Sequence, residues 1–440
     1  PNTPKDNTID EYFAEKVADP YRWLENDTSA ATAEWVRAEN AVTRKYLDNL
    51  PMRGAILKRL KETANYEKIG MPFEKGGKWY VFRNNGLQNQ SVLYQMDRAN
   101  APEKEQRVWL DPNTLSQDGT VALKSVSFSH DGKFMAYVIS RNGSDWEEIY
   151  VKDVATGKTL PDHIQWAKFT TATWRGDGFY YSAYDAPEKG KETSAKNSVQ
   201  KIYFHCMGTD QSADQLFYQN PSQPLRFYGV SVDDDEHFMY MSEDGMDNGN
   251  NLYLRNLSQP DAQFIQMCSD PRFRYSPVGT IGDKTYILTN AGAPKYRLMV
   301  AEADKPGYTD WQEVVPEGES VLEDVTFTEG DRMILQYSKD NCNQLFVYSI
   351  KGQRLAEIKL PTFGSTSVSG KRTQKELFYS FTSYTVPNTI YNYDTATGKS
   401  SVVATPKVAF RASDYMTEML FYTSKDGTRA PLFITHKKGL

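Results

Sequence analysis

The nucleophilic and basic side chains of this chain do not form a recognisable catalytic motif. One large class of serine hydrolases places its nucleophile in Gly-x-Ser-x-Gly, because the glycines permit the sharp turn that exposes the hydroxyl. No serine here has glycine at both flanking positions. The nearest candidates, Ser365 and Ser367 between Gly364 and Gly370, read as a strand between turns. The histidines are His130, His163, His205, His237 and His436. None has serine and aspartate partners in the order that such a triad requires, so we expect no catalytic residue in this chain.

The cysteines and acidic runs do not indicate a disulfide framework or a metal site. Cys206, Cys268 and Cys342 lie far apart, and an odd number without close spacing is typical of small apolar strand residues. The run from Asp233 to Glu236 lacks the Asp-x-Asp-x-Asp-Gly order of a calcium loop, so we interpret it as a solvated turn. We therefore expect no metal and no cofactor.

The elements that carry these residues repeat along the chain. In Ser125 to Gly157, the turn signal Asp131-Gly132 precedes a strand, Phe134 to Ser140, that is apolar on both faces. Similar pairs of turn and aromatic-rich strand recur about every 43 to 57 residues, which is the spacing of four-stranded propeller blades. The turn signals are Gly76-Gly77, Asp131-Gly132, Gly176 to Gly178, Asp233 to Asp235, Gly282-Asp283, Gly330-Asp331 and Gly370 to Gln374. The sequence therefore predicts a mainly β fold, a seven-bladed β-propeller over residues 72–410, and disfavours a β-sandwich with many hairpins.

Composition and charge narrow the class of partner. The chain has 51 Lys and Arg against 57 Asp and Glu, a net charge of −6, and no local basic stripe. These values argue against a nucleic acid or an anionic membrane as partner. No apolar run approaches the roughly 20 residues that span a bilayer. We expect a soluble protein, in the cytoplasm or the periplasm, since an export signal can have been removed before Pro1.

The first 71 residues predict helices outside the propeller. Thr28 and Ser29 are plausible N-caps for a helix that ends near Asn49, and a second helix begins near Pro51 and runs to about Asn65. The last repeat supplies four short strands of its own, so we expect no strand shared between the two ends of the propeller. The seam between the first and last blades would then depend on side-chain packing, mainly apolar.

Residues 411–440 break the repeat. They predict a β-hairpin with its turn at Ser424 to Gly427, in which Met419, Phe421, Leu432 and Ile434 provide apolar faces. No further strand follows before Leu440, so we interpret this segment as the start of a truncated domain.

Three separated motifs resemble the prolyl oligopeptidase family of serine peptidases. They are DPYRWLE at 19–25 with WVRAEN at 35–40, Ser144-Asp145-Trp146, and FYTSKDGTRAPLFITHKKG at 421–439. The resemblance covers essentially the whole chain. It implies that residues 1–71 associate with an α/β-hydrolase domain, that residues 411–440 are the first hairpin of that domain, and that the propeller covers it. In that family the triad follows the region matched here, so the resemblance implies that this chain alone is inactive.

The resemblance also suggests three substrate-binding residues. Local matching places Tyr180, Phe227 and Met246 where the family contacts the peptide upstream of proline. Each is large and apolar, and each has an alternative interpretation as an inter-blade packing or exposed loop residue.

Two function classes follow. The chain is either the propeller and N-terminal part of a serine endopeptidase that cleaves short peptides after proline, or a non-catalytic propeller that serves as a binding module. The hairpin favours the first, because a finished binding module has no use for two strands of an incomplete sheet. The partners implied are short proline-containing peptides and the missing hydrolase domain, with no nucleic acid and no membrane.

Overall fold

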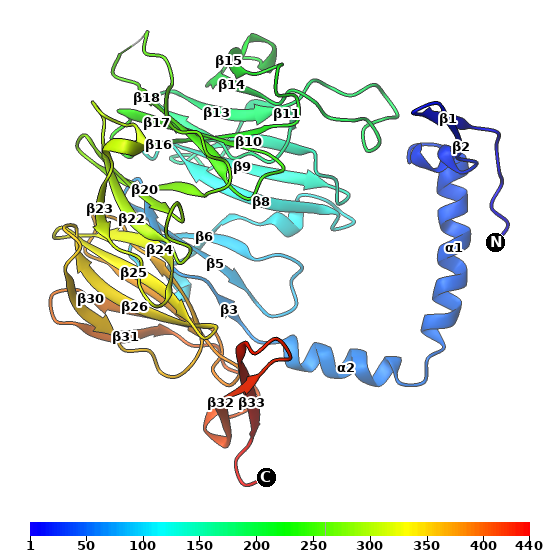
Figure 1. The fold of residues 1–440 in the computed structure, drawn as a ribbon. Coiled ribbons are helices and arrows are strands. Elements are labelled where there is room, and N and C mark those ends of the chain that lie inside the picture. The colour runs from blue at the N-terminus through cyan, green and yellow to red at the C-terminus, as the bar shows by residue number, and fades with distance from the viewer. Residues whose placement is uncertain (260) are drawn as a thin grey trace.

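The main body of the molecule is a ring of antiparallel β-sheets, from which two helices and a β-hairpin project (Figure 1). A computed structural model describes residues 1–259 and 261–440. The first sheet of the ring has five strands. They are β3 (Lys68–Ile69), β4 (Phe73–Lys75), β5 (Lys78–Asn84), β6 (Val92–Met96) and β7 (Arg107–Leu110).

Four further sheets of the ring each contain four strands, paired in chain order. The first of these sheets contains β16 (Phe227–Val232), β17 (Phe238–Asp244), β18 (Asn250–Asn256) and β19 (Ile265–Cys268). The second contains β20 (Tyr275–Ile281), β21 (Lys284–Thr289), β22 (Arg297–Glu302) and β23 (Gln312–Val315). The third contains β24 (Val321–Thr328), β25 (Arg332–Lys339), β26 (Cys342–Ser349) and β27 (Arg354–Ile358). The fourth contains β28 (Ser365–Ser369), β29 (Leu377–Thr382), β30 (Thr389–Asp394) and β31 (Lys399–Ala404).

The remaining sheet of the ring corrects the predicted blade count. Residues 121–219 form one eight-stranded sheet instead of two separate blades. Its strands are β8 (Val121–Phe128), β9 (Phe134–Arg141), β10 (Glu147–Asp153), β11 (Thr159–Ala167), β12 (Thr173–Arg175), β13 (Gly178–Ala183), β14 (Lys201–Cys206) and β15 (Gln215–Gln219). The described residues thus give five separate blades and one wide sheet, so the prediction of seven four-stranded blades is wrong. The cause is local: Ala167 of β11 pairs with Ala183 of β13, and this single pair joins two sequence repeats.

Aromatic side chains fill the space between neighbouring sheets. The rings of Tyr80 on β5 and Phe128 on β8 are 4.6 Å apart, and those of Tyr286 on β21 and Phe327 on β24 are 5.1 Å apart. Both pairs bridge adjacent sheets, where flat rings bury a large apolar area. This packing explains why each repeat needs an aromatic-rich strand.

The seam of the ring lies between the first and last sheets. In the part of the chain that the structure describes, no sheet contains strands from both ends of the ring, which confirms that prediction. Trp79 packs edge-on against Phe378 with ring centroids 5.9 Å apart. Glu74 adds polar contacts, accepting hydrogen bonds from Lys371 and Gln374. The seam is therefore apolar in part and polar in part.

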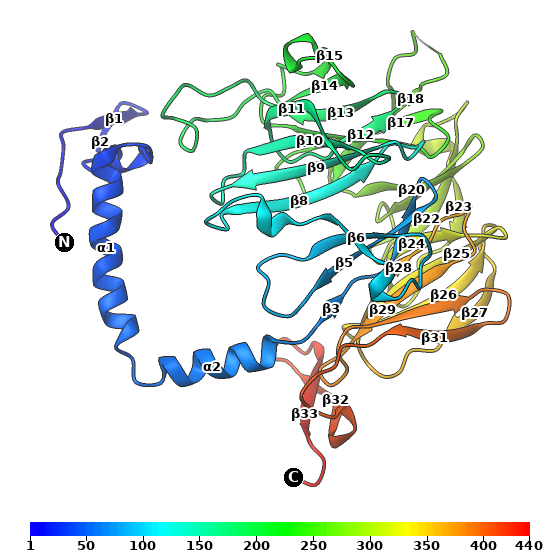
Figure 2. The same cartoon turned by 180° about the vertical axis from the view of Figure 1, so that it is seen from behind.

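The N-terminal segment forms an arm that projects from the ring and meets it again at its far end, where the Thr193 hydroxyl of the β13–β14 loop donates to Asp27 at 2.9 Å (Figures 1 and 2). It contains a hairpin that the sequence did not predict, β1 (Ile9–Tyr12) and β2 (Glu15–Ala18), and then α1 (Ala30–Asp48) and α2 (Arg53–Ala64). Ser29 caps α1, since its hydroxyl accepts the Thr32 N–H at 3.1 Å. The 3-10 helices of the chain are η1 (Arg22–Glu25), η2 (Glu103–Glu105), η3 (Pro112–Thr114), η4 (Gln211–Ala213), η5 (Tyr308–Asp310) and η6 (Ala412–Asp414). Outside position 260, no helix is long and apolar enough to cross a bilayer.

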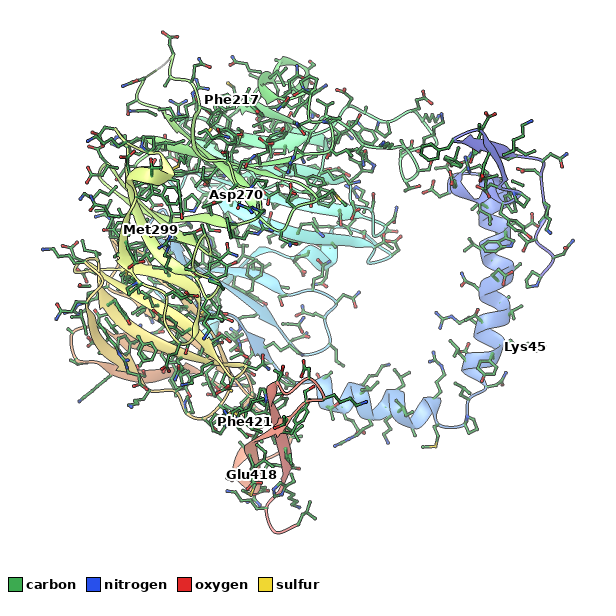
Figure 3. The ribbon with its side chains drawn as sticks, in the orientation of Figure 1. Lys45, Phe217, Asp270, Met299, Glu418 and Phe421 are labelled. Carbon is green, nitrogen blue, oxygen red and sulfur yellow. The ribbon has the colours of Figure 1, made fainter. Side chains whose placement is uncertain are left out.

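The C-terminal hairpin also projects from the ring. β32 (Tyr415–Thr423) pairs with β33 (Arg429–Lys437), and the Ser424 N–H donates to Thr428 across the predicted turn. Phe433 on β33 packs against Phe363 and Tyr384 of the ring, with centroids 6.5 and 5.8 Å apart. Figure 3 shows the side chains of Glu418 and Phe421 on this projecting hairpin, and Lys45 on the distant arm.

Candidate functional site

A cavity of about 900 Å³ runs through the centre of the ring. The strand nearest the axis in each repeat lines it, namely β4, β8, β12, β16, β20, β24 and β28. Much of the wall is apolar or hydroxyl-bearing, with residues such as Val126, Thr173, Val230 and Val325.

Charged turns surround one mouth of this channel. Glu74, Lys75, His130, Asp234 and Lys371 all line it. Burial, together with the positive charge of Lys371, lowers the pKa of Lys75. The turns contact one another across the mouth, because His130 Nδ1 lies 3.2 Å from the Asp234 carbonyl oxygen.

Two glycines close part of the same mouth. Gly76 and Gly132 both have left-handed backbone, with φ of 59° and 70°. A Cβ added to Gly76 would lie 2.6 Å from the Gly132 Cα, closer than real Cβ atoms approach. The turns between β4 and β5 and between β8 and β9 therefore touch backbone to backbone, which explains two of the glycine turn signals.

The opposite end of the channel carries an exposed aromatic pair. β16 runs from Phe227 to Val232, and the turn that follows it contains Asp234 of the charged mouth, so Phe227 lies at the other end. The Phe227 ring meets the Phe169 ring edge-on with centroids 5.7 Å apart. Phe169 is 57% exposed and Phe227 36% exposed. Exposed rings in contact at a channel end form a surface suited to an apolar side chain of a ligand.

The three substrate-binding residues predicted from the sequence have different environments. Phe227 lies in the aromatic pair, and Met246, in the β17–β18 loop, is 94% exposed. Arg226, next to Phe227, forms an ion pair with Asp247, next to Met246, at 2.8 Å, so the two segments are neighbours. Tyr180 is only 2% exposed and packs against Phe204 and Phe217, both at 4.7 Å. Its burial leaves Tyr180 no surface for a peptide.

Phe169 is the residue that the sequence reasoning missed. It follows β11 in the segment Lys168-Phe169-Thr170, where nothing in the pattern distinguishes an exposed ring from a packed one. Its backbone is left-handed, with φ of 55°, which is uncommon for a non-glycine residue. A second cavity, of about 340 Å³, adjoins Phe169 and is lined by polar groups that include Lys124, Glu147 and Ser182.

The histidines and serines do not assemble into a nucleophilic site. Ser365 and Ser367 lie on β28, in the ring. Among the hydrogen bonds of the described residues, no histidine ring bonds to a serine hydroxyl. His205 is fully buried between two carboxylates, with Nδ1 2.7 Å from Asp214 Oδ1 and Nε2 3.1 Å from Asp162 Oδ1. Outside position 260, no group of His, Cys, Asp and Glu side chains is arranged to hold a metal ion.

The arm and the hairpin expose apolar side chains to solvent. On the helices and the turn between them these are Val36, Val42, Tyr46, Met52, Ile56, Leu57 and Leu60, and on the hairpin Leu420, Tyr422, Leu432 and Ile434. Each is more than a third exposed. Apolar faces of this size are characteristic of surfaces that another part of a protein covers.

The chain is similar to known proteins over its whole length. The family model described as prolyl oligopeptidase, N-terminal β-propeller domain, matches residues 1–406. A prolyl endopeptidase from Elizabethkingia meningoseptica is 40% identical over 442 aligned positions, which cover 100% of this chain and 62% of that protein. Prolyl oligopeptidase A from Amanita bisporigera is 31% identical, with 100% and 62% covered.

Solved structures give the same result. A structure from a study of two prolyl endopeptidases has a TM-score of 0.87 and 30% identity, and the match covers 100% of this chain and 64% of that chain. Prolyl oligopeptidase B from Galerina marginata, bound to a 35mer hydrolysis and macrocyclization substrate, has a TM-score of 0.86 and 27% identity, with 100% and 65% covered. This chain thus spans less than two thirds of the length of these relatives.

Proposed function

Because this chain belongs to the prolyl oligopeptidase family, we propose that it forms the propeller and N-terminal segment of a serine endopeptidase that cleaves short peptides after proline. The observation that carries the proposal is the match along all 440 residues to proteins named prolyl endopeptidase. The nucleophile, its base and the oxyanion site would lie in the part of the protein beyond the matched region, which covers 62% of these relatives.

The exposed apolar surfaces support different roles for the arm, the hairpin and the propeller. Residues 1–71 and 411–440 would contact the hydrolase domain through the apolar faces of α1, α2 and the hairpin, and residues 72–410 would form the propeller that covers it. The arm and the hairpin leave the ring at neighbouring points, where α2 leads into β3 and β31 leads into β32 (Figure 2). Both would then reach the same partner domain.

The channel and the aromatic pair support a route for peptides. A peptide would pass the charged turns or the seam, occupy the channel, and meet Phe169, Phe227 and Met246 beside the hydrolase domain. Size exclusion by the channel would restrict the substrates to short, unfolded peptides. The aromatic pair would contact an apolar side chain upstream of the proline, and no cofactor is required for this chemistry.

A fusion protein tests the proposal directly. The part of the Elizabethkingia relative beyond the aligned region is joined after Leu440, and hydrolysis of a proline-linked chromogenic peptide is measured. We expect turnover by the fusion, inhibition by a serine-directed phosphonate, and no turnover by the 440-residue chain alone. The matched control is the same fusion with the nucleophilic serine of the added part replaced by alanine. A folded fusion without activity, or activity of the 440-residue chain alone, would contradict the proposal.

A further inference from the structure

The backbone that presents the Phe169 ring is held in an unfavourable conformation. Trp166 and Phe169 both have left-handed backbone, with φ of 59° and 55°. Such residues persist only where surrounding contacts fix them, since the Cβ disfavours this region. The contacts that hold residues 166–170 therefore determine where the Phe169 ring lies.

One of these contacts comes from a buried carboxylate. Glu147, the first residue of β10, is 7% exposed, and its Oε2 accepts the Thr170 N–H at 3.2 Å. This bond fixes the peptide plane that follows the strained residue Phe169.

Two further contacts complete the support. The Thr170 hydroxyl accepts the Ser182 N–H at 2.8 Å, which ties the segment to β13. The Gln200 side chain donates to the Lys168 carbonyl at 3.0 Å and accepts the Tyr228 N–H at 2.6 Å. Since Tyr228 follows Phe227, this amide links the segments that carry the two rings.

An ion pair does not explain the position of Glu147 among the described residues. Among the salt bridges of the described residues, none includes Glu147, although the charges of Lys124 and Asp145 act on it from a distance. Burial raises the pKa of Glu147. A buried carboxylate that is satisfied by a backbone amide costs desolvation free energy, so packing alone does not explain a glutamate at this position. Its position is better explained by the backbone that it holds.

We propose that Glu147 is a positioning residue for peptide binding, which holds the left-handed backbone at Phe169 and so sets the contact between the Phe169 and Phe227 rings. The inference depends on the proposed function, since it assumes that the ring pair contacts an apolar side chain of a peptide. Glu147 does not itself touch the peptide side chain. Its effect is on selectivity for apolar over small residues.

Peptide binding by the 440-residue chain tests this inference. The probes are acetylated, proline-containing tetrapeptide amides in which each other position is in turn Phe, Leu or Gly, and affinity is measured by titration. In Glu147→Ala we expect the peptide with the best-placed apolar residue to bind about tenfold more weakly, the loss of one good apolar contact. Its Gly counterpart should bind within twofold of the wild-type value. Glu147→Gln keeps an oxygen acceptor for the Thr170 N–H, so it should restore most of the selectivity.

Glu148→Gln is the matched control. Glu148 is the next residue, and among the described residues its carboxylate bonds to Arg141, Tyr150 and His163 and to no residue of 166–170. It should leave the affinity ratio unchanged. Equal weakening of the apolar and Gly peptides in Glu147→Ala, or no weakening of either, would overturn the proposal.

A second readout separates this inference from the proposed function. Nuclear Overhauser contacts between the Phe169 and Phe227 rings are measured in the chain without peptide. The contacts should be present in the wild type and Glu147→Gln and absent in Glu147→Ala. If no peptide binds while the ring contacts change as expected, the positioning role holds and peptide binding by this surface fails. If the ring contacts survive in Glu147→Ala, the positioning role fails whatever binds.

Discussion

Lys371 and Glu74 are 297 positions apart in the sequence, and Lys371 Nζ lies 3.3 Å from Glu74 Oε2 across the seam of the ring. No backbone ladder joins the first and last sheets in the described part of the chain, so this pair, the Gln374–Glu74 hydrogen bond and the Trp79–Phe378 contact resist opening there. Both residues of the ion pair also line the charged mouth of the channel. The stability of the seam and the charge of the mouth are therefore linked.

Removal of the Lys371 charge should loosen the seam. Lys371→Met should lower the free energy of unfolding by about 0.5–1 kcal/mol, the usual contribution of a partly exposed ion pair. The loss should shrink at 1 M salt, where the screening length falls to about 3 Å. Urea unfolding measures both effects. The control is Lys78→Met, which breaks an exposed pair with Asp97 inside one sheet. If the two variants are equally stable at every salt concentration, the seam pair has no special role.

The buried His205 should make stability depend on pH. Burial alone would lower the pKa of His205, but hydrogen bonds and charges from Asp214 and Asp162 outweigh it and raise the pKa. Asp214 also accepts a hydrogen bond from the Tyr181 hydroxyl at 2.7 Å, which orients the carboxylate. The charged imidazole therefore links β14 to β11 and to the start of β15, within the eight-stranded sheet.

The sign of the effect follows from the raised pKa. A raised folded pKa means that the stabilisation is complete below the unfolded pKa of about 6.5 and is lost as pH rises through the folded value. Wild-type stability should thus fall on the alkaline side, and His205→Gln, which is always neutral, should lack this step. Thermal unfolding between pH 5 and pH 9 gives the comparison, with His237→Gln, at an exposed turn, as control. Parallel curves for wild type and His205→Gln would show that the buried pairing has no net effect.

The sequence predicts well those features that depend on local patterns. The helices from Ala30 and Arg53, the cap at Ser29 and the hairpin with its turn at Ser424 lie where caps, apolar spacing and turn residues place them. The repeat is also local, since each turn and aromatic strand lies within one unit. Family membership follows from short motifs for the same reason.

The features that the sequence did not reveal depend on contacts between units. One residue pair, Ala167 with Ala183, joins two repeats into a wide sheet, and alanine carries no signal for such pairing. Tyr180, within β13, lies in the core and Phe169, just after β11, at the surface, although both are aromatic residues of the same sheet region. Burial of a ring depends on which neighbouring sheet faces it, and that is settled by the tertiary arrangement and not by the local pattern.

The hairpin should depend on a single aromatic anchor. Phe433 is the residue of β33 whose ring contacts Phe363 and Tyr384 of the ring of sheets. In Phe433→Ala, backbone amides of 415–437 should exchange with solvent faster, because the hairpin loses its packing partner and a lone two-stranded hairpin is marginal in water. Hydrogen exchange by mass spectrometry checks this, with Leu432→Ala, an exposed neighbour, as control. Equally fast exchange in both variants and the wild type would show that the Phe433 contacts do not stabilise the hairpin.

Gly132 at the channel mouth should tolerate alanine far less well than Gly77. Both have left-handed backbone, with φ of 70° and 73°, so alanine at either costs about 1–2 kcal/mol in backbone strain. A Cβ on Gly77 meets nothing within 4 Å, whereas a Cβ on Gly132 would overlap the backbone of Gly76 in the adjoining sheet. Gly132→Ala should therefore cost about 1–3 kcal/mol more than Gly77→Ala, because two turns must move apart to admit the methyl group.

The difference between the unfolding free energies of Gly132→Ala and Gly77→Ala measures the contact alone, since the backbone strain is the same in both and cancels. Gly143→Ala is a second control, because Gly143 has φ of 71° and open space around it. If the overlap at Gly132 matters, Gly132→Ala should lower the free energy of unfolding more than Gly143→Ala does. Equal losses at all three glycines would mean that the turns at the mouth are free to separate, and that backbone contact does not limit the width of the channel there.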